Sequence, residues 1–304
     1  MKLFFILVLE VFIYSSFTYS QLPDSLRNKF EIPKYSTNDV LIMHKGFSLV
    51  YNEKHEQASW VAYELTAEET VKSFERSNKF LEDPLVSSGT ATDEDYSSSG
   101  YDRGHLAPAA DMSWSEQTMR ESFFYSNMSP QTPSFNRGIW KKLEEKVRDW
   151  ATEYKQLFVV TGPILSDTLS LSIGINKVTV PRYYYKVLCD TLNKKGIGFV
   201  LPNSASSLPL NSFAISIDSV EVLTGINFFP TLSKKDEVIY EKQVCIECWN
   251  WGNTLKVTEQ IAPSKVDTTK LETSVRCIAT TKAGKRCKSK TLSPNSKCSK
   301  HGGN

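Results

Sequence analysis

Net charge is nearly absent from this sequence. Lys and Arg number 36 and Asp and Glu number 34, which gives the 304 residues a formal net charge of +2 at pH 7. No overall electrostatic field marks the chain as a binder of polyanions, so any affinity for nucleic acid must come from local patches. The hydrophobic content of 40% is high enough to build a core, and the composition therefore indicates a globular protein.

Long apolar runs are absent from the chain after its N-terminal segment. No later segment is apolar for long enough to span a bilayer. The N-terminus itself holds one lysine and a short apolar run with a single acid, and the small residues Thr18 and Ser20 follow. This is the pattern of a signal peptide, so we expect residues 1–20 to be removed and the protein to be secreted or periplasmic. A short membrane anchor is the alternative, but the run is shorter than the roughly 20 residues that a bilayer requires.

Histidine is scarce, with four in the chain. His44 and His55 flank a predicted hairpin and have no acidic or cysteine companion at the spacing of metal ligands. A functional histidine normally has a partner that places it. We therefore predict that both lie on the surface.

The pattern of apolar residues predicts strands on either side of a helical middle. A capping box from Ser113 to Glu116 predicts a helix from Trp114 to about Tyr125. Apolar residues at helical spacing predict a second helix over residues 139–154. Alternating, β-branched and aromatic segments predict strands over residues 46–51, 58–65, 156–161, 178–188, 196–201 and 213–217. This order of elements predicts an α+β fold.

The run Asp102-Arg103-Gly104-His105 places an acid, a guanidinium group and an imidazole in adjacent positions. In a strand, Arg103 and His105 face the same side. The imidazole can take a proton from water near neutral pH, and the guanidinium group offers a fixed positive charge to phosphate. Arg103 can instead pair with a structural carboxylate, and the sequence leaves both roles open.

A second polar group follows at Asn136 and Glu144. An asparagine offers a neutral oxygen to a hard cation such as Mg²⁺. Glu144 lies eight residues further on, which is about 80° around a helix, so both side chains can face one cleft if the helix begins near Asn136. The two polar groups together have the parts of a one-metal phosphodiesterase site.

Four motifs in a fixed order strongly resemble the DNA/RNA non-specific endonucleases, the endonuclease G-like ββα-metal group, also called His-Me finger nucleases. The motifs are residues 102–111, 124–131, 135–140 and 160–163. The resemblance covers roughly residues 46–229, the expected core of the domain. It implies a ββα-metal fold with a mixed or antiparallel sheet and a metal-dependent endonuclease that cuts DNA and RNA.

The resemblance also assigns roles to residues. It implies that His105 is the general base, that Asn136 is the only direct protein ligand of Mg²⁺ or Mn²⁺, and that Glu144 holds metal-bound waters. It further implies an upstream arginine that steadies the phosphate. Arg76 is the candidate, although by its own sequence context it is a solvated charge. DNA and RNA backbones are the expected partners, and an inhibitor protein and a homodimer are left open.

Two other functions remain open from the sequence. One is a catalytically silent protein that binds nucleic acid on a nuclease scaffold. The presence of His105, Asn136 and Glu144 together argues against it, because binding alone has no use for a base. The other is a nuclease toxin delivered to competitors, which an inhibitor encoded beside it would favour.

The C-terminus carries Cys277, Cys287, Cys298 and His301 in a Cys-x9-Cys-x10-Cys-x2-His pattern. Three thiolates and an imidazole suit tetrahedral Zn²⁺, and the segment resembles small Cys3His zinc modules. A segment this short would need the metal in order to fold. Disulfide bonds are the alternative, because a signal peptide implies an oxidising compartment.

The expected domain boundaries follow from these motifs. The endonuclease domain is expected over residues 21–255, a linker over 256–273 and the small metal-stabilised module over 274–304. Cys245 and Cys248 form a close pair that can be a disulfide, a redox pair or metal ligands, and the sequence favours none of these. Cys189 lies in a predicted strand and is expected to be a buried free thiol.

Overall fold

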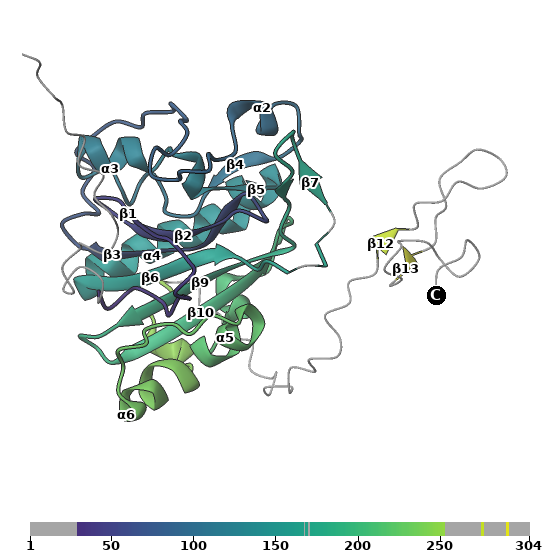
Figure 1. Ribbon diagram of the computed structural model, residues 1–304. Coiled ribbons are helices and arrows are strands. Elements are labelled where there is room, and N and C mark those ends of the chain that lie inside the picture. Colours follow the sequence, from purple (N-terminus) through teal and green to yellow (C-terminus); the bar gives the residue numbers. More distant parts are fainter. Residues whose placement is uncertain (1–28, 167, 170, 253–274, 277–289, 292–304) are drawn as a thin grey trace, which may run out of the picture. The chain divides into compact units, whose positions relative to one another are not determined.

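The computed structural model describes residues 29–166, 168–169, 171–252, 275–276 and 290–291 (Figure 1). The chain divides into two compact units, Met1–Trp251 and Gly252–Asn304. The signal peptide expected at residues 1–20 and all four candidate zinc ligands lie outside the described residues. Of the second unit, the described parts are Gly252 and two strands, β12 (Val275–Arg276) and β13 (Lys290–Thr291), which pair antiparallel.

The first unit is built on a seven-stranded sheet of order β1-β2-β3-β6-β9-β10-β11. Every neighbouring pair in it is antiparallel. The strands are β1 (Leu41–Met43), β2 (Ser48–Asn52), β3 (Gln57–Thr66), β6 (Gln156–Pro163), β9 (Tyr183–Asp190), β10 (Lys195–Pro202) and β11 (Ala214–Ile215). Together with the helices they confirm the predicted α+β class.

Smaller elements surround the sheet. The short strands are β4 (Asp102–His105), β5 (Met128–Gln131), β7 (Ser172–Ile173) and β8 (Val178–Thr179). The α-helices are α2 (Asp93–Tyr96), α3 (Glu116–Glu121), α4 (Lys141–Tyr154), α5 (Ile217–Thr224) and α6 (Lys234–Glu237). The 3-10 and π turns are η2 (Tyr125–Asn127), η3 (Phe135–Trp140), η4 (Leu210–Phe213), η5 (Val238–Lys242) and η6 (Ile246–Cys248). No described helix combines the length and apolar character needed to cross a membrane.

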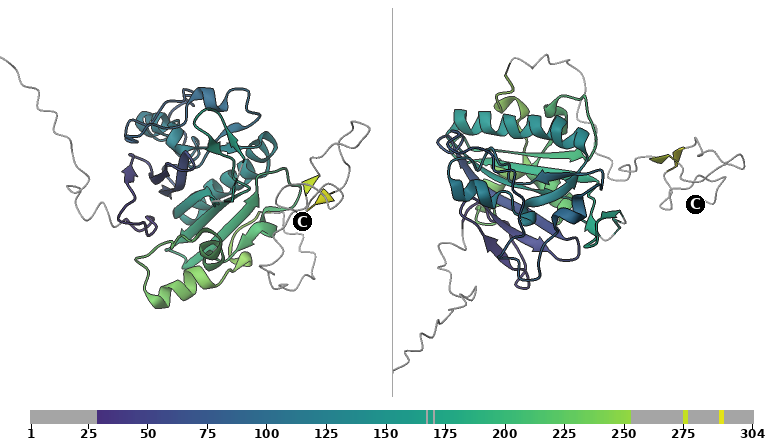
Figure 2. Two further views of the ribbon diagram at one scale, coloured as in Figure 1. Left: turned by 45° about the vertical axis from the view of Figure 1, so that its right-hand side comes forward. Right: turned by 90° about the horizontal axis from the view of Figure 1, so that it is seen from above.

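Both faces of the sheet are buried. Because side chains alternate between the two faces along a strand, each strand contributes residues to both cores. In β3, Val61 and Tyr63 belong to the core cluster that contains Trp150 of α4. Trp60 and Ala62 point to the other face, in the cluster that contains α5 and η5 residues. Helix α4 therefore covers one face and α5 with η5 covers the other, as Figure 2 shows for α4 lying along the sheet.

Local signals explain where the structure departs from the predicted elements. Helix α3 begins after Ser115, whose side chain accepts a hydrogen bond from the Thr118 amide at 3.2 Å, and not at Ser113 as the capping-box pattern predicted. The strand predicted over residues 178–188 divides into β8 and β9, since Pro181 has no amide hydrogen for the ladder. The last predicted strand shrinks to β11, because Ser216 caps α5.

His44 and His55 are buried, so the prediction of two surface histidines is wrong. His44 Nε2 lies 2.8 Å from the Asp83 carboxylate, and both side chains are almost fully buried. His55 Nδ1 lies 3.0 Å from the Thr179 hydroxyl. The partners come from positions 39 and 124 residues away, so spacing along the sequence could not reveal them.

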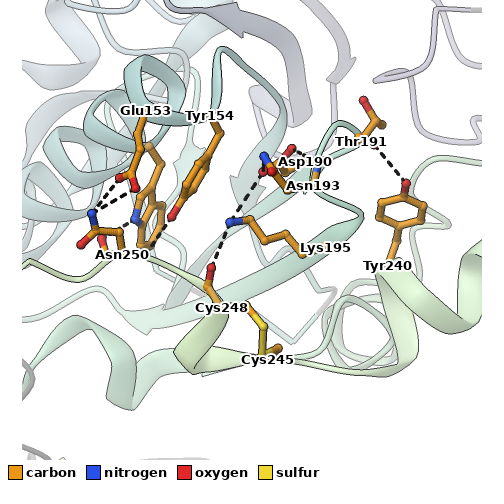
Figure 3. Close-up of polar contacts among 11 residues, drawn as sticks. Glu153, Tyr154, Asp190, Thr191, Asn193, Lys195, Tyr240, Cys245, Cys248 and Asn250 are labelled. Carbon is orange, nitrogen blue, oxygen red and sulfur yellow. Dashed lines mark hydrogen bonds and ion pairs between the residues drawn. A yellow bond between two sulfur atoms is a disulfide. The ribbon is translucent and has the colours of Figure 1, made fainter.

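Cys245, which precedes η6, and Cys248, at the end of η6, form a disulfide bond (Figure 3). The carbonyl oxygen of Cys248 accepts a hydrogen bond from Lys195 Nζ at 3.0 Å. This bond fastens the turn to β10. Cys189 is a buried free thiol in β9, as predicted.

The segment after the disulfide packs on α4. Trp249 and Trp251 are buried, with ring centroids 4.7 and 5.0 Å from the ring of Trp150. The Asn250 amide donates to the Tyr154 hydroxyl at 2.8 Å (Figure 3). The packed core thus reaches Trp251, beyond the end near residue 229 that the sequence predicted.

Candidate active site

The predicted catalytic motif forms β4, which pairs antiparallel with β5 outside the main sheet (Figure 1). His105 lies opposite Met128 in this two-stranded ribbon, and Asp102 lies opposite Gln131. Gly104 fits because a Cβ atom there would collide with the buried side chain of Gln131. The ribbon is followed by the η3 turn and α4, so two strands and a helix carry the candidate residues.

His105 has a free nitrogen in an apolar enclosure. It is 8% exposed, and its Nε2 atom has no hydrogen-bond partner among the described residues. Its ring packs edge-on against Phe123 at 4.8 Å and lies 5.9 Å from Phe80. The opposite ring nitrogen donates to the backbone of Arg103, a bond that acts to raise the pKa of the imidazole. Nε2 is therefore the atom available to accept a proton.

Burial keeps the imidazole of His105 neutral. Desolvation is the larger cause, and the positive charge of Arg76 is the second, and together they lower the pKa of His105 from 6.5 to about 3. A neutral imidazole is the form that acts as a base. His105 is thus held in the basic form at neutral pH.

Asn136 in η3 is oriented by Asp102 of β4. Its Nδ2 atom donates to Asp102 Oδ2 at 2.9 Å. Arg137 donates two further hydrogen bonds to the same carboxylate, at 2.8 and 2.6 Å. A carboxylate only accepts hydrogen bonds, so it fixes the amide nitrogen toward itself and directs the carbonyl oxygen of Asn136 away. That oxygen is a suitable ligand for a hard cation.

Glu144 lies in the first turn of α4 and is half-buried. Desolvation raises the pKa of its carboxyl, and the neighbouring charge of Lys186 opposes this rise. Lys186 of β9 is fully buried, its Nζ atom has no hydrogen-bond partner among the described residues, and it lies 5.0 Å from the centre of the Trp140 ring. Burial lowers the pKa of Lys186, while the charge of Glu144 raises it.

Lys186 was not recognised in the sequence, although a lysine inside the apolar run of β9 is an available signal. An ion pair lies beside it: Arg148 Nη1 contacts the Asp111 carboxylate at 2.7 Å, and Tyr63 donates to the same carboxylate at 2.8 Å. The charges of Asp111 and Arg148 act on both Glu144 and Lys186. Glu144 therefore lies beside a group of charges formed by Lys186, Asp111 and Arg148.

Arg76, in an exposed loop, lies near both His105 and Glu144. Its guanidinium lies 4.9 Å above the ring of Phe123, the ring that also contacts His105. The charge of Glu144 raises the pKa of Arg76, although desolvation has the larger, opposite effect. The structure thus brings Arg76, His105 and Glu144 together, although they are far apart in the sequence.

Arg103 is engaged with a carboxylate. Its Nη2 atom pairs with Asp93 of α2, and its Nε atom donates to the Tyr125 hydroxyl at 3.1 Å. The guanidinium also lies 5.2 Å from the ring of Phe80, which His105 contacts, so both residues face the same side as strand alternation predicted. Of the two roles left open for Arg103, the geometry displays the pairing with a carboxylate.

A cavity of about 340 Å³ lies beside β2 and includes Asp39, Tyr51 and Val86 in its lining, but none of the candidate site residues. The candidate residues instead gather around the β4–β5 ribbon and the start of α4.

Comparison with known proteins agrees with this arrangement. Residues 26–235 match the family described as DNA/RNA non-specific endonuclease. Nuclease C1 of Cunninghamella echinulata var. echinulata is 37% identical over 206 residues, 62% of this chain and 82% of that protein. Mitochondrial endonuclease G of Bos taurus is 33% identical over 220 residues, 66% of this chain and 74% of that protein.

Solved structures show the same similarity. A chain from the crystal structure of the EndoG/EndoGI complex matches with a TM-score of 0.63 and 31% sequence identity. The match covers 70% of this chain and 94% of that chain. The chain therefore belongs to the DNA/RNA non-specific endonuclease family and is a nuclease.

Proposed function

We propose that this nuclease hydrolyses phosphodiester bonds within DNA and RNA in a metal-dependent reaction, with His105 as the general base. The observation that carries the proposal is the unpartnered Nε2 atom of a buried, neutral His105 beside the positive charge of Arg76. A phosphodiester anion repels the nucleophile, so its hydrolysis needs both a base and positive charge. This site supplies the two together.

The residues fit a hard divalent cation. Asn136 presents a neutral carbonyl oxygen because Asp102 holds its amide nitrogen. Mg²⁺ keeps several of its waters in proteins, so one direct ligand and a carboxylate that holds waters are sufficient, and Glu144 would be that carboxylate. Mn²⁺ accepts the same oxygen donors. When bound, the metal ion would polarise a phosphoryl oxygen and stabilise the leaving oxygen.

The side chains divide the remaining work. His105 takes the proton of the attacking water through Nε2, while the Arg103 backbone holds the other ring nitrogen. Arg76 offers its guanidinium to the phosphate and balances the charge that develops there. The Arg103 side chain, tied to Asp93, supports the wall of the site through Phe80. Contacts to the phosphate backbone carry no base information, which supports a substrate range that includes DNA and RNA.

The compartment and partners extend this proposal. The protein would be secreted or periplasmic, and the Cys245–Cys248 disulfide supports an oxidising compartment. A dedicated inhibitor protein is a proposed partner, since the similar EndoG structure is a complex described by its mechanism of inhibition. A homodimer remains a prediction from the sequence.

The C-terminal module is proposed to bind Zn²⁺ through Cys277, Cys287, Cys298 and His301. The support is the spacing of these residues in the sequence, because the four ligands lie outside the described residues. Zinc content of the purified full chain, measured by atomic emission, would test the proposal. Less than about half an equivalent of zinc would favour disulfide bonds instead.

The enzymatic proposal is tested by cleavage of plasmid DNA and of RNA by residues 21–304 with Mg²⁺ or EDTA. We expect metal-dependent cutting by the wild type and a loss of at least about 100-fold in His105→Ala, the upper range of a general base being about 10⁴-fold. His55→Gln, a second buried histidine outside the site, is the matched control and should keep its activity. Cutting that survives His105→Ala would remove His105 as the base.

A further inference from the structure

A cluster of three carboxylates lies away from the nuclease site. Asp218 and Glu221 are three residues apart on one face of α5, and Glu241 approaches them from η5. One oxygen atom from each side chain lies within 4.8 Å of the others. The core residues of α5 and η5 pack on the opposite face of the sheet from α4, which carries Glu144. The cluster is therefore distinct from the proposed catalytic site.

Glu241 is the member that indicates a ligand. It is only 5% exposed, and its Oε1 atom has no hydrogen-bond partner among the described residues. Burial and the charges of Glu221, Glu237 and Asp218 raise the pKa of Glu241 to about 8. An unpartnered buried oxygen is costly, and a bound cation would satisfy it in place of a proton. The other two carboxylates are half-buried, so water and ions can reach the cluster from their side.

Among the described residues, no lysine or arginine forms an ion pair with the cluster, although the charge of Lys234 acts on Glu221 and Glu241. Lys234 commits its ammonium to Glu237, with both carboxylate oxygens within 2.9 Å. Glu221 Oε1 accepts the Phe228 amide at 2.7 Å, and this is the one side-chain hydrogen bond to the cluster from the described part of the chain. Several carboxylate oxygens therefore remain available.

We propose that Asp218, Glu221 and Glu241 bind a divalent cation of the Ca²⁺ type. The donors are all carboxylate oxygens, which select hard cations over the metals that prefer nitrogen or sulfur. Ca²⁺ accepts an irregular set of ligands completed by water, whereas Mg²⁺ requires a near-ideal octahedron. Two ligands from one helical turn and a third from a separate turn make an irregular set of this kind.

The bound cation would join α5 to η5. Both elements cover the sheet face that holds Tyr240, Ile217 and Val220. The site would exist in the folded protein and not in the unfolded chain, so Ca²⁺ would stabilise the fold by mass action. A site of this kind contributes to stability and is independent of phosphodiester hydrolysis.

Thermal unfolding of EDTA-treated residues 21–304 tests the proposal as CaCl2 is added. We expect Tm to rise by about 5–10 °C at a hundredfold excess over the dissociation constant. Glu241→Gln should abolish this shift, and it should still fold because it keeps the shape of the side chain. Glu247→Gln is the control, since it removes one negative charge from an exposed residue that is not part of the cluster.

Asn136→Ala separates this site from the catalytic one and should keep the full Ca²⁺ shift. No shift in the wild type, or an equal shift in wild type and Glu241→Gln, would overturn the proposal. A shift that is lost in Asn136→Ala but kept in Glu241→Gln would also overturn it by placing Ca²⁺ at the nuclease site. Plasmid cleavage with Mg²⁺, followed in parallel, reports on the proposed function alone.

Discussion

Asp102 Oδ2 accepts a hydrogen bond from Asn136 Nδ2 at 2.9 Å. This contact joins the first strand of the catalytic ribbon to the turn before α4 across 34 residues of sequence. It decides which end of the amide faces the site, because a carboxylate cannot donate a hydrogen bond to the amide oxygen. Asp102 is therefore a positioning residue for the proposed metal ligand.

The Asp102 contact predicts a metal-dependent defect. Asp102→Ala frees the amide of Asn136 to rotate, so activity should fall by about 10–100-fold, and the Mg²⁺ concentration at half-maximal activity should rise. Titration of activity with Mg²⁺ measures both effects. Arg137→Gln removes the other partner of Asp102 and should have a smaller effect. A lower rate at an unchanged Mg²⁺ requirement would contradict the positioning role.

Lys186 and Glu144 are predicted to be energetically coupled. Lys186→Met leaves the half-buried carboxyl without its opposing charge, and Glu144→Gln leaves the lysine without its own. The double variant should lose less stability than the sum of the single variants, by about 1–3 kcal/mol, as coupled neighbours do. Urea unfolding of the four proteins measures this cycle. Additivity within about 0.5 kcal/mol would show that the two groups do not interact.

His105 predicts how stability depends on pH. Its pKa is about 3 when folded, against 6.5 for a free histidine, so between these values the unfolded chain binds more protons. The free energy of unfolding should therefore fall as pH drops from about 6.5 toward 3, by up to about 1.4 kcal/mol per pH unit from this group. Urea unfolding at several pH values should give a shallower slope for His105→Gln. Identical slopes would mean that His105 protonates normally in the folded protein.

At the C-terminal end of the first unit, we expect loss of the buried Trp249 ring to reduce stability more than loss of the disulfide. Trp249→Ala removes a ring that is 1% exposed and should lower the free energy of unfolding by about 3–5 kcal/mol. Replacing Cys245 and Cys248 by serine opens only a short loop and should cost about 2 kcal/mol. Urea unfolding compares the two variants. A larger loss from the cysteine change would mean that the disulfide, and not the tryptophan, anchors this segment.

Local patterns were sufficient for much of the fold. The 3.6-residue spacing of apolar side chains predicted α4, and alternation predicted β2, β3, β6 and β10 within a residue or two at most ends. These signals depend on neighbours that are close in sequence, so they can be read without the fold. His105, Asn136 and Glu144 were also named from residue type and motif order.

The tertiary structure alone decided the state of those side chains. His44 and His55 were predicted to be exposed because their partners Asp83 and Thr179 are distant in sequence. The pairing of Arg103 with Asp93 and the carboxylate cluster around Glu241 likewise depend on chain segments that meet only in the fold. Burial and nearby charges set the pKa of a group, and its neighbours decide whether its polar atoms have hydrogen-bond partners. Both properties depend on what surrounds the group in space. Sequence therefore determined which chemical groups this nuclease has, and tertiary structure determined which of them are free to react.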